Sequence, residues 1–424
     1  MIVMVEVAFE KIVPEGKALG FLDGRACFAI GPLPGETARV SLIQDKRRYT
    51  EAVLEEVVVA SEHRRPGAEE HFLSCSPWQG VDYDYQLELK RQMLAETFAR
   101  PELRLPVTEL VPAPQMVGYR NKLEFALAAD SSGRLSLAFH ARRNSTELIS
   151  LPHGCRLGTE AMNRVALGLL ERLNALDVAD YARSLTVRRA EATGRLLAVV
   201  GVREAPERDW SRLAVPGLSG LVVSRVRPGR RPQVLWHRDE AGLAETVVGV
   251  ELSYAYDGFF QTNVPMFERA LARILVVLPR DGRVVDLYGG VGAIGIPAAR
   301  ECREVVGVEI DAAAVERANM NARRADLANY HAQATPAERL DPAVLVGADC
   351  VVVDPPRAGL HHRVAQALLE AAPKRIVYLS CNPATQARDL MRLAETYRAE
   401  AVTGFDFYPS TLHLESLAIL ERVR

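Results

Sequence analysis

The spacing of apolar residues changes character along the chain. Over about the first 60 positions, short alternating runs are separated by turn formers such as Asp23-Gly24. Several short strands at this spacing predict a small five-stranded barrel of the OB type over residues 1–62. Lys46 and Arg47 bring positive charge to a strand end beside an aromatic ring. This combination suits contact with single-stranded nucleic acid, and a solvated barrel edge is the alternative.

In the middle of the chain, the apolar residues do not follow one regular spacing. Residues 62–81 lack periodicity and predict an irregular linker, whereas residues 85–99 have the apolar spacing of a helix. Farther along, strand-like runs surround one long helical segment at 159–176. This mixture predicts a central α+β domain built from residues 63–84 and 101–260.

Beyond residue 260, helices alternate regularly with short and almost continuously apolar strands. The strand segments include RVVDLYGG, EVVGVEID, CVVVDPP and RIVYLSC. Runs of Val and Ile are typical of parallel strands that helices cover on both faces. We therefore predict a doubly wound, mostly parallel α/β domain over residues 261–424. In such a domain, ligands bind at the carboxyl ends of the strands.

The composition of the chain is most useful for the classes of protein that it excludes. The 424 residues are 48% hydrophobic and 25% charged, which suits two or three globular domains. The formal net charge of -2 gives no general preference for nucleic acid, so an RNA-binding surface must be a local positive patch. We see no signal peptide, no apolar run of membrane-spanning length and no regular cysteine framework. We therefore expect a cytoplasmic monomer without a membrane partner.

Candidate cofactor-binding residues follow the first two strands of the last domain. Gly289, Gly290 and Gly292 allow a ligand to approach the backbone and leave free N–H groups at the next helix. Glu309 follows about 20 residues later, where an acid can hold a ribose hydroxyl pair. A position beside a helix N-cap is the alternative for Glu309. Together the two motifs indicate a nucleoside-containing cofactor, and their spacing fits both NAD and S-adenosylmethionine.

Candidate catalytic groups follow the later strands. Asp354 stands at the tip of a rigid turn made by Pro355 and Pro356, where a purely structural turn is the alternative. Cys381 comes directly after an apolar strand, and the N-terminus of the helix that follows would favour its thiolate. Glu415 lies near the end of the chain and is either a solvated acid or a catalytic base.

Taken in order, these segments resemble one enzyme family. The chain is similar to the RNA (uracil-5-)-methyltransferases, which modify tRNA and ribosomal RNA, in FFQTN, DLYGGVGAIG, GVEID, DPPRAGL, YLSCNPAT and FYPSTLHLES. The resemblance also includes YRNK at 119–122 and a barrel that is similar to a TRAM domain, so it covers nearly the whole chain. It implies a class I methyltransferase fold and assigns the helix at 85–100 to the catalytic domain.

The resemblance implies a role for each candidate residue. S-adenosylmethionine would be the cofactor, with contacts from Gln261, Tyr288, Gly290, Glu309 and Asp354. Catalysis would depend on Cys381 as the nucleophile, Glu415 as the general base, and Asp354. RNA would be held through Tyr119, Arg120 and Lys122, for which an ordinary exposed strand is the alternative.

The chain departs from the family in one respect. Many relatives bind a [4Fe–4S] cluster through three closely spaced cysteines and a fourth farther on. Here the first region contains Cys75 alone, and Cys155 occupies the fourth position. Two thiolates fall short of the usual four ligands. We therefore predict no iron–sulfur cluster and no metal, with packing around Phe72 and Trp78 in its place.

The reaction that the family implies is methylation of C5 of a uridine in tRNA or ribosomal RNA. Addition of the Cys381 thiolate to C6 would make C5 nucleophilic, and Glu415 would then remove the C5 hydrogen. Asp354 would accept a hydrogen bond from uracil N3–H, and the target base must leave its stack. Two other functions remain open. One is a base amino-methyltransferase, which Asp-Pro-Pro also suits, and the other is an RNA-binding chaperone without turnover.

Overall fold

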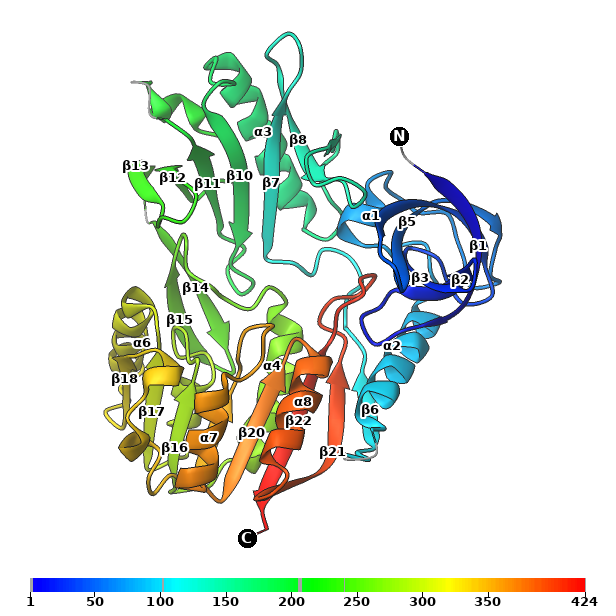
Figure 1. Cartoon of the computed structure of the whole chain (residues 1–424). Helices are drawn as coiled ribbons and strands as arrows, with labels where there is room; N and C mark the ends of the chain where they lie inside the picture. Colours follow the sequence, from blue (N-terminus) through cyan, green and yellow to red (C-terminus); the bar gives the residue numbers. More distant parts are fainter. Residues whose placement is uncertain (1–2, 101–102, 205–207, 240, 424) are drawn as a thin grey trace.

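The protein consists of a small barrel, a central sheet and a carboxy-terminal sheet, which occupy three regions of the molecule (Figure 1). This computed structural model describes residues 3–100, 103–204, 208–239 and 241–423. Within those ranges, no helix combines the length and the apolar character that crossing a bilayer requires. The predicted fold class, with its N-terminal barrel and mostly parallel sheet, is confirmed.

The barrel forms because alternate residues of its strands point inward. Val7 and Phe9, for example, are buried, whereas Glu6, Ala8 and Glu10, which alternate with them, are exposed. Its strands are β1 (Met4–Ile12), β2 (Ala18–Leu22), β3 (Arg25–Ile30), β4 (Thr37–Asp45) and β5 (Tyr49–Val59). They close in the order β1-β2-β3-β5-β4. Closure leaves no strand edge unpaired in the ladder.

Two helices connect the barrel to the rest of the chain. They are α1 (Phe72–Cys75) and α2 (Tyr83–Phe98). Helix α1 lies in the segment that we predicted to be irregular, and α2 corresponds to the predicted helix. The side chains of Leu89, Met93 and Phe98 on α2 join the same apolar core as the carboxy-terminal sheet. Helix α2 therefore packs on that sheet, as Figure 1 also shows.

The central sheet carries one long helix on one face. Its strands are β7 (Lys122–Ala129), β8 (Leu135–His140), β9 (Leu148–Ser150), β10 (Ala182–Arg189), β11 (Leu196–Val202), β12 (Gly220–Arg225) and β13 (Gln233–Arg238). They lie in the order β13-β12-β11-β10-β7-β8-β9. The remaining elements are α3 (Glu160–Ala175), η1 (Trp210–Leu213) and the hairpin β14 (Gly242–Val247) and β15 (Val250–Ala255). Thr159 caps α3 by accepting a hydrogen bond from the Met162 N–H.

The carboxy-terminal sheet contains eight strands. They are β16 (Arg283–Leu287), β17 (Glu304–Glu309), β18 (Tyr330–Ala334), β19 (Cys350–Val353), β20 (Arg375–Ser380), β21 (Tyr397–Phe405), β22 (Glu415–Arg422) and β6 (Val107–Val111). Their order is β18-β17-β16-β19-β20-β22-β21-β6, and β22 runs antiparallel to both of its neighbours. Strand β6 differs from the prediction, which placed it in the central domain. It pairs parallel with β21 because α2 delivers the chain to that edge.

Helices cover both faces of this sheet, as the continuous apolar strands predicted. Val351 and Val353 of β19 face one apolar core, and Cys350 and Val352 face the other. The first core includes α2, α7 (His362–Ala371) and α8 (Pro383–Leu393). The second includes α4 (Val264–Val277), α5 (Gly295–Ala298) and α6 (Ala312–Arg324). Two short 3-10 turns, η2 (Ala337–Arg339) and η3 (Pro342–Val344), connect β18 to β19.

Candidate active site

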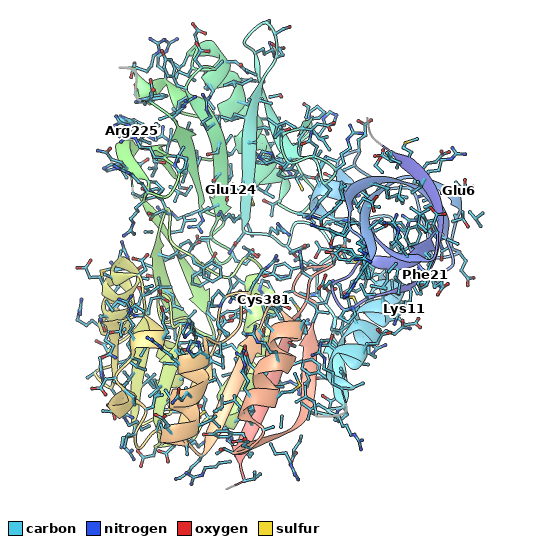
Figure 2. The ribbon with its side chains drawn as sticks, in the orientation of Figure 1. Glu6, Lys11, Phe21, Glu124, Arg225 and Cys381 are labelled. Atoms are coloured by element: carbon cyan, nitrogen blue, oxygen red, sulfur yellow. The ribbon has the colours of Figure 1, made fainter. Side chains whose placement is uncertain are left out.

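Strand register brings the candidate catalytic residues to one edge of the carboxy-terminal sheet. The antiparallel pair β20 and β22 matches Ser380 with Ser416, so Cys381 and Glu415 lie one residue beyond this pair. Val353 of β19 pairs with Tyr378 of β20, so Asp354 leaves its strand at the same edge. Residues that the chain separates by up to 61 positions thus meet at one place. Figure 2 shows Cys381 at this edge, on the side toward the central sheet.

A cavity of about 650 Å³ opens at this edge. Every residue that we predicted for catalysis and cofactor binding contributes to its lining, namely Gln261, Tyr288, Gly290, Glu309, Asp354, Cys381 and Glu415. The volume is in the range of small-molecule sites, which commonly hold about 300–1,000 Å³. The structure therefore brings together all the residues of these two groups.

The glycine turn after β16 presents its backbone to the cavity. Gly290 has a positive φ of 54°, and a Cβ added there would meet no atom within 4 Å. The Gly290 N–H donates to the Glu309 carboxylate over 3.1 Å, and the Asp311 N–H donates to the other oxygen over 2.9 Å. Asp286 accepts from the Gly295 N–H over 2.9 Å and closes the turn. Open space above a glycine beside an oriented acid suits a nucleoside.

Asp354 is held by one amide. The Gln261 side-chain N–H donates to Asp354 Oδ2 over 3.1 Å, and the backbone oxygen of Gln261 accepts from Asn121 over 3.0 Å. Burial raises the pKa of Asp354 to about 7, and the Gln261 hydrogen bond opposes this shift. Burial thus favours the neutral form of Asp354, and a cation that enters the cavity would favour its carboxylate.

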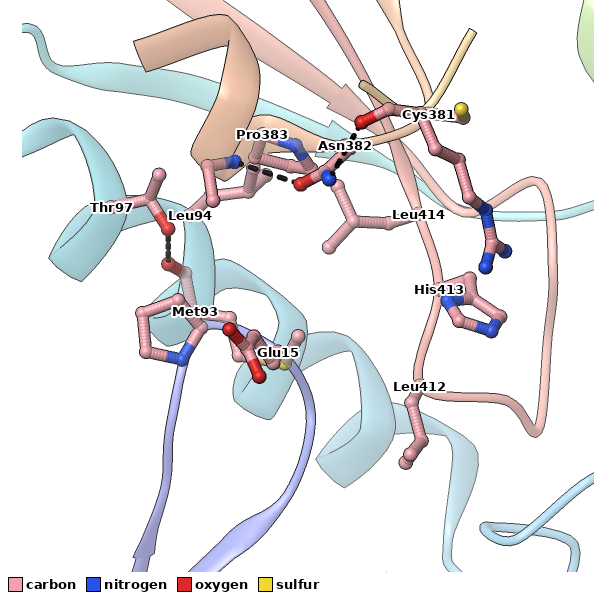
Figure 3. A pocket seen from close by; sticks show the side chains of 13 residues that line it. Glu15, Met93, Leu94, Thr97, Cys381, Asn382, Pro383, Leu412, His413 and Leu414 are labelled. Atoms are coloured by element: carbon pink, nitrogen blue, oxygen red, sulfur yellow. Dashed lines mark hydrogen bonds between the residues drawn. The ribbon is translucent and has the colours of Figure 1, made fainter. Parts of the chain in front are cut away.

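Cys381 lies between the large cavity and a smaller one of about 150 Å³, which Figure 3 shows. Asn382 caps α8 by accepting from the Ala384 N–H over 3.2 Å, and its amide donates to the Arg357 carbonyl over 3.0 Å (Figure 3). We expected the start of α8 to favour the thiolate. Instead burial, together with Glu415 and Asp354, raises the pKa of Cys381 to about 11, against a smaller opposing effect of Arg357. Desolvation and two carboxyl groups outweigh the helix end.

Glu415 is the most enclosed of the three groups. Its Oε2 is buried without a hydrogen-bond partner among the described residues, and Oε1 lies 3.5 Å from the Tyr408 hydroxyl, which donates. Burial, followed by repulsion from Asp354, raises the pKa of Glu415 well above its usual value. An acid in this environment forms a strong base once it loses its proton.

The loop between β21 and β22 is held in place by side chains of helix α2. Lys90 on α2 forms a fully buried ion pair with Asp406 at 2.6 Å and also donates to the Tyr408 carbonyl over 2.9 Å. The Tyr83 hydroxyl donates to the other Asp406 oxygen over 2.9 Å. Helix α2 thereby fixes the segment that leads to Glu415.

The candidate RNA-binding residues do not gather as closely. Lys46 and Arg47 are exposed in the turn between β4 and β5, away from the lining of the large cavity. Lys122 pairs with Glu124 at 2.8 Å. Arg120 is half-buried, with its guanidinium carbon 6.0 Å from the ring centre of Tyr408.

Tyr119 has a different environment from the one that a stacking residue needs. It is 3% exposed, and its hydroxyl donates to the Pro409 carbonyl over 3.1 Å. Its ring is packed inside the protein and is closed to a base in this conformation. An aromatic residue beside two cations suggested an exposed platform, but apolar neighbours in the central core hold the ring inward.

Among the residues that line the large cavity, three without a predicted role have side chains suited to contact a ligand. They are Phe259, Arg357 and Tyr408. Phe259 is 73% exposed, which is unusual for a large apolar side chain and gives the cavity an aromatic rim. Phe259 and Arg357 belong to the FFQTN and DPPRAGL segments. These segments thus contain functional candidates in addition to the residues predicted from them.

Comparison with known proteins adds independent observations. The sequence profile of the family described as tRNA (Uracil-5-)-methyltransferase matches residues 223–423. A protein of Nitratidesulfovibrio vulgaris named as an RNA methyltransferase is 32% identical over 98% of this chain and 95% of its own length. A protein of Nostoc sp. that is also named as an RNA methyltransferase is 29% identical over 98% of this chain and 96% of its own length. A solved structure of Pyrococcus abyssi tRNA (uracil-54, C5)-methyltransferase with S-adenosyl-L-homocysteine has a TM-score of 0.78 at 24% identity. It covers 98% of this chain and 100% of that one, and supports the same fold.

Proposed function

This chain belongs to the RNA (uracil-5-)-methyltransferase family of S-adenosylmethionine-dependent enzymes, and we propose on that basis that it methylates C5 of a uridine through a covalent bond from Cys381 to C6. One observation carries the proposal. A thiol, two carboxyl groups and a glycine turn with an oriented acid all line one cavity. A base amino-methyltransferase needs no thiol at that place.

The cavity has features that suit the cofactor. Gly290 leaves open space above its backbone, and Glu309 is oriented by N–H donors. S-adenosylmethionine supplies the methyl group on a positively charged sulfur. Gln261, Tyr288, Gly290, Glu309 and Asp354 would hold it, and the negative charge of Asp354 would favour a cation nearby.

Cys381 and Glu415 act in sequence on the uracil ring in this proposal. The thiolate of Cys381 adds to C6, and the electrons of the C5=C6 bond move toward O4, so C5 becomes the nucleophile that takes the methyl group. Glu415 then removes the proton from C5. The C5=C6 bond forms again as the bond from C6 to sulfur breaks. Asp354 accepts a hydrogen bond from uracil N3–H and so orients the ring.

Surrounding residues would position the RNA. The exposed ring of Phe259 and the guanidinium of Arg357 lie at the cavity, where they can contact a flipped base and a phosphate. Lys46, Arg47 and Lys122 would contribute phosphate contacts farther away. The substrate is tRNA or ribosomal RNA. We also propose that the reaction takes place in the cytoplasm and that the protein acts as a monomer.

Nucleoside mapping in a deletion strain tests the proposed reaction. Total RNA from the strain should lack 5-methyluridine at one position, and the intact gene should restore it. A gene with Cys381→Ala should not restore it, whereas Cys302→Ala, a buried cysteine outside the cavity, should. Unchanged 5-methyluridine with loss of a methylated exocyclic amine would favour the amino-methyltransferase. No change in any methylated nucleoside would favour the chaperone.

A further inference from the structure

A second group of polar side chains lies outside the large cavity. Glu69, His71 and Cys75 come from the segment around α1, and Cys155 comes from the loop before α3. Each offers one ligand atom, and these atoms all lie within 4.8 Å of one another. The four ligands belong to segments that are 80 residues apart in the chain. Such convergence of two thiols, an imidazole and a carboxylate is typical of a metal site.

His71 provides an observation that is independent of this clustering. It is 6% exposed, and its Nε2 is buried without a hydrogen-bond partner among the described residues. The same nitrogen lies 3.6 Å from Glu69 Oε2. A buried imidazole nitrogen without a partner is costly for folding. A metal ion between these ligands would satisfy it.

The ligands are held in place by outer contacts. Gln79 donates to Glu69 Oε2 over 2.7 Å, and the Arg156 N–H donates to Glu69 Oε1 over 2.7 Å. Asn163 accepts from the Cys155 N–H over 3.0 Å. The Cys75 sulfur lies 3.1 Å from the Ser76 hydroxyl. Hydrogen bonds of this kind, made to residues that bind a metal, orient those residues and tune the affinity of the site for the metal.

The two cysteines alone led us to predict no metal here, but with Glu69 and His71 beside them we propose that Glu69, His71, Cys75 and Cys155 bind one zinc ion. Two thiolates, one imidazole and one carboxylate are ligands that Zn²⁺ accepts in tetrahedral geometry, at about 2.3 Å for sulfur and about 2.0–2.2 Å for nitrogen and oxygen. Ligand atoms around such an ion are on the order of 3.5 Å apart. The His71–Glu69 pair at 3.6 Å already has this spacing, and the other ligand atoms, all within 4.8 Å of one another, would move closer on binding. Four protein ligands leave no open position, and the site is therefore structural.

The zinc ion would join two parts of the molecule that flank the large cavity. From the α1 segment, the Trp78 N–H donates to the Ser410 carbonyl over 3.0 Å, in the loop that leads to Glu415. From the Cys155 loop, the Leu157 carbonyl accepts from the Arg120 N–H over 2.9 Å. One ion thus ties the linker after the barrel to the segment that carries Arg120. This inference does not depend on the proposed reaction.

Metal analysis of the purified full-length protein tests the proposal. Protein prepared without chelators should contain about one zinc per chain, and Cys155→Ser and His71→Gln should lose most of it. Matched controls should retain their zinc. These are Glu70→Gln, an exposed neighbour of Glu69, and Cys302→Ser, a cysteine outside the cluster.

Cobalt substitution makes the test independent of how well the variants fold. Unaltered protein loaded with Co²⁺ should show thiolate-to-cobalt charge-transfer absorption and tetrahedral d–d bands, and added zinc should abolish both. Failure of the folded protein to bind Zn²⁺ or Co²⁺ would overturn the proposal. Iron with acid-labile sulfide in an anaerobic preparation, or a Cys75–Cys155 disulfide in the freshly purified protein, would also overturn it.

Discussion

Burial, followed by two acidic neighbours, raises the pKa of the Cys381 thiol. Burial, Glu415 and Asp354 together raise its pKa to about 11, so at neutral pH the free protein holds mainly the protonated form. The thiolate must therefore form after ligands enter the cavity. Positive charge brought close to Cys381 would lower its pKa by favouring the thiolate.

Replacement of Glu415 by Gln should separate the two halves of the reaction. The variant keeps the shape of the side chain but has no carboxylate to remove the C5 proton, so elimination of Cys381 fails. We predict that it accumulates a methylated protein–RNA adduct that withstands denaturing electrophoresis. Its multiple-turnover rate should fall by about 10²–10⁴-fold. Normal turnover by Glu415→Gln would remove Glu415 from the role of base.

Asp286 makes stability depend on pH. Burial raises its pKa to about 7, whereas an unfolded Asp titrates near 3.9. Between these values the folded state binds a proton that the unfolded state lacks, so this contribution is full below about pH 4 and lost as pH rises to about 7. It amounts to roughly 1.4 kcal/mol for each unit of the pKa difference.

Chemical unfolding across that pH window measures this effect. The free energy of unfolding of Asp286→Asn should fall less between pH 5 and pH 7.5 than that of the unaltered protein, because Asn stays neutral. Asp326→Asn, at an exposed position, is the control and should keep the original slope. Equal slopes for Asp286→Asn and the unaltered protein would contradict the assignment.

At the scale of elements, α2 supports the loop between β21 and β22. Replacement of Lys90 by Met would leave the Asp406 carboxylate buried beside the Tyr83 hydroxyl but without its cation. We predict destabilisation by about 3–5 kcal/mol, which thermal unfolding would detect as a lower midpoint. Lys11→Met is a matched control, because the Lys11–Glu96 pair is about half-exposed. It should cost less than about 1 kcal/mol, and equal effects of the two changes would refute the argument.

The elements also show what the sequence could predict. Residues at the ends of parallel strands, such as Asp354 and Cys381, were identified because apolar runs reveal where each strand stops. The Lys90–Asp406 pair spans 316 positions, and no local pattern signals it. Strand β6 was assigned to the wrong domain because a five-residue strand does not reveal its partner. Tyr119 shows the same limit for a single side chain, since its exposure depends on tertiary packing.

Over the whole molecule, the barrel lies close to the large cavity. The turn between β1 and β2 touches the loop between β21 and β22, since a Cβ at Gly16 would lie 2.5 Å from the Leu412 Cβ. Pro14 and Glu15 of the same turn line the smaller cavity beside Cys381. Figure 1 shows the barrel beside α2 and the carboxy-terminal sheet. RNA bound at the cavity can therefore extend along the barrel.

Salt dependence of binding should reveal whether the barrel contacts RNA. Replacement of Lys46 and Arg47 by Ala should weaken binding and reduce the slope of log affinity against log salt by about 0.7 for each lost phosphate contact. Lys374→Ala is the control. Lys374 lies at the amino end of β20, far from the cavity, which opens at the carboxyl end of that strand. Unchanged slopes in the double variant would place the RNA path elsewhere.

The covalent bond to Cys381 is the central claim, and trapping it is the most direct test. RNA that contains 5-fluorouridine has no removable proton at C5, so the adduct cannot resolve. After incubation with S-adenosylmethionine and proteolysis, mass spectrometry should find a methylated fluorouridine on the peptide that contains Cys381, and Cys381→Ala should form none. An adduct at another residue, or turnover by Cys381→Ala on normal RNA, would contradict the account.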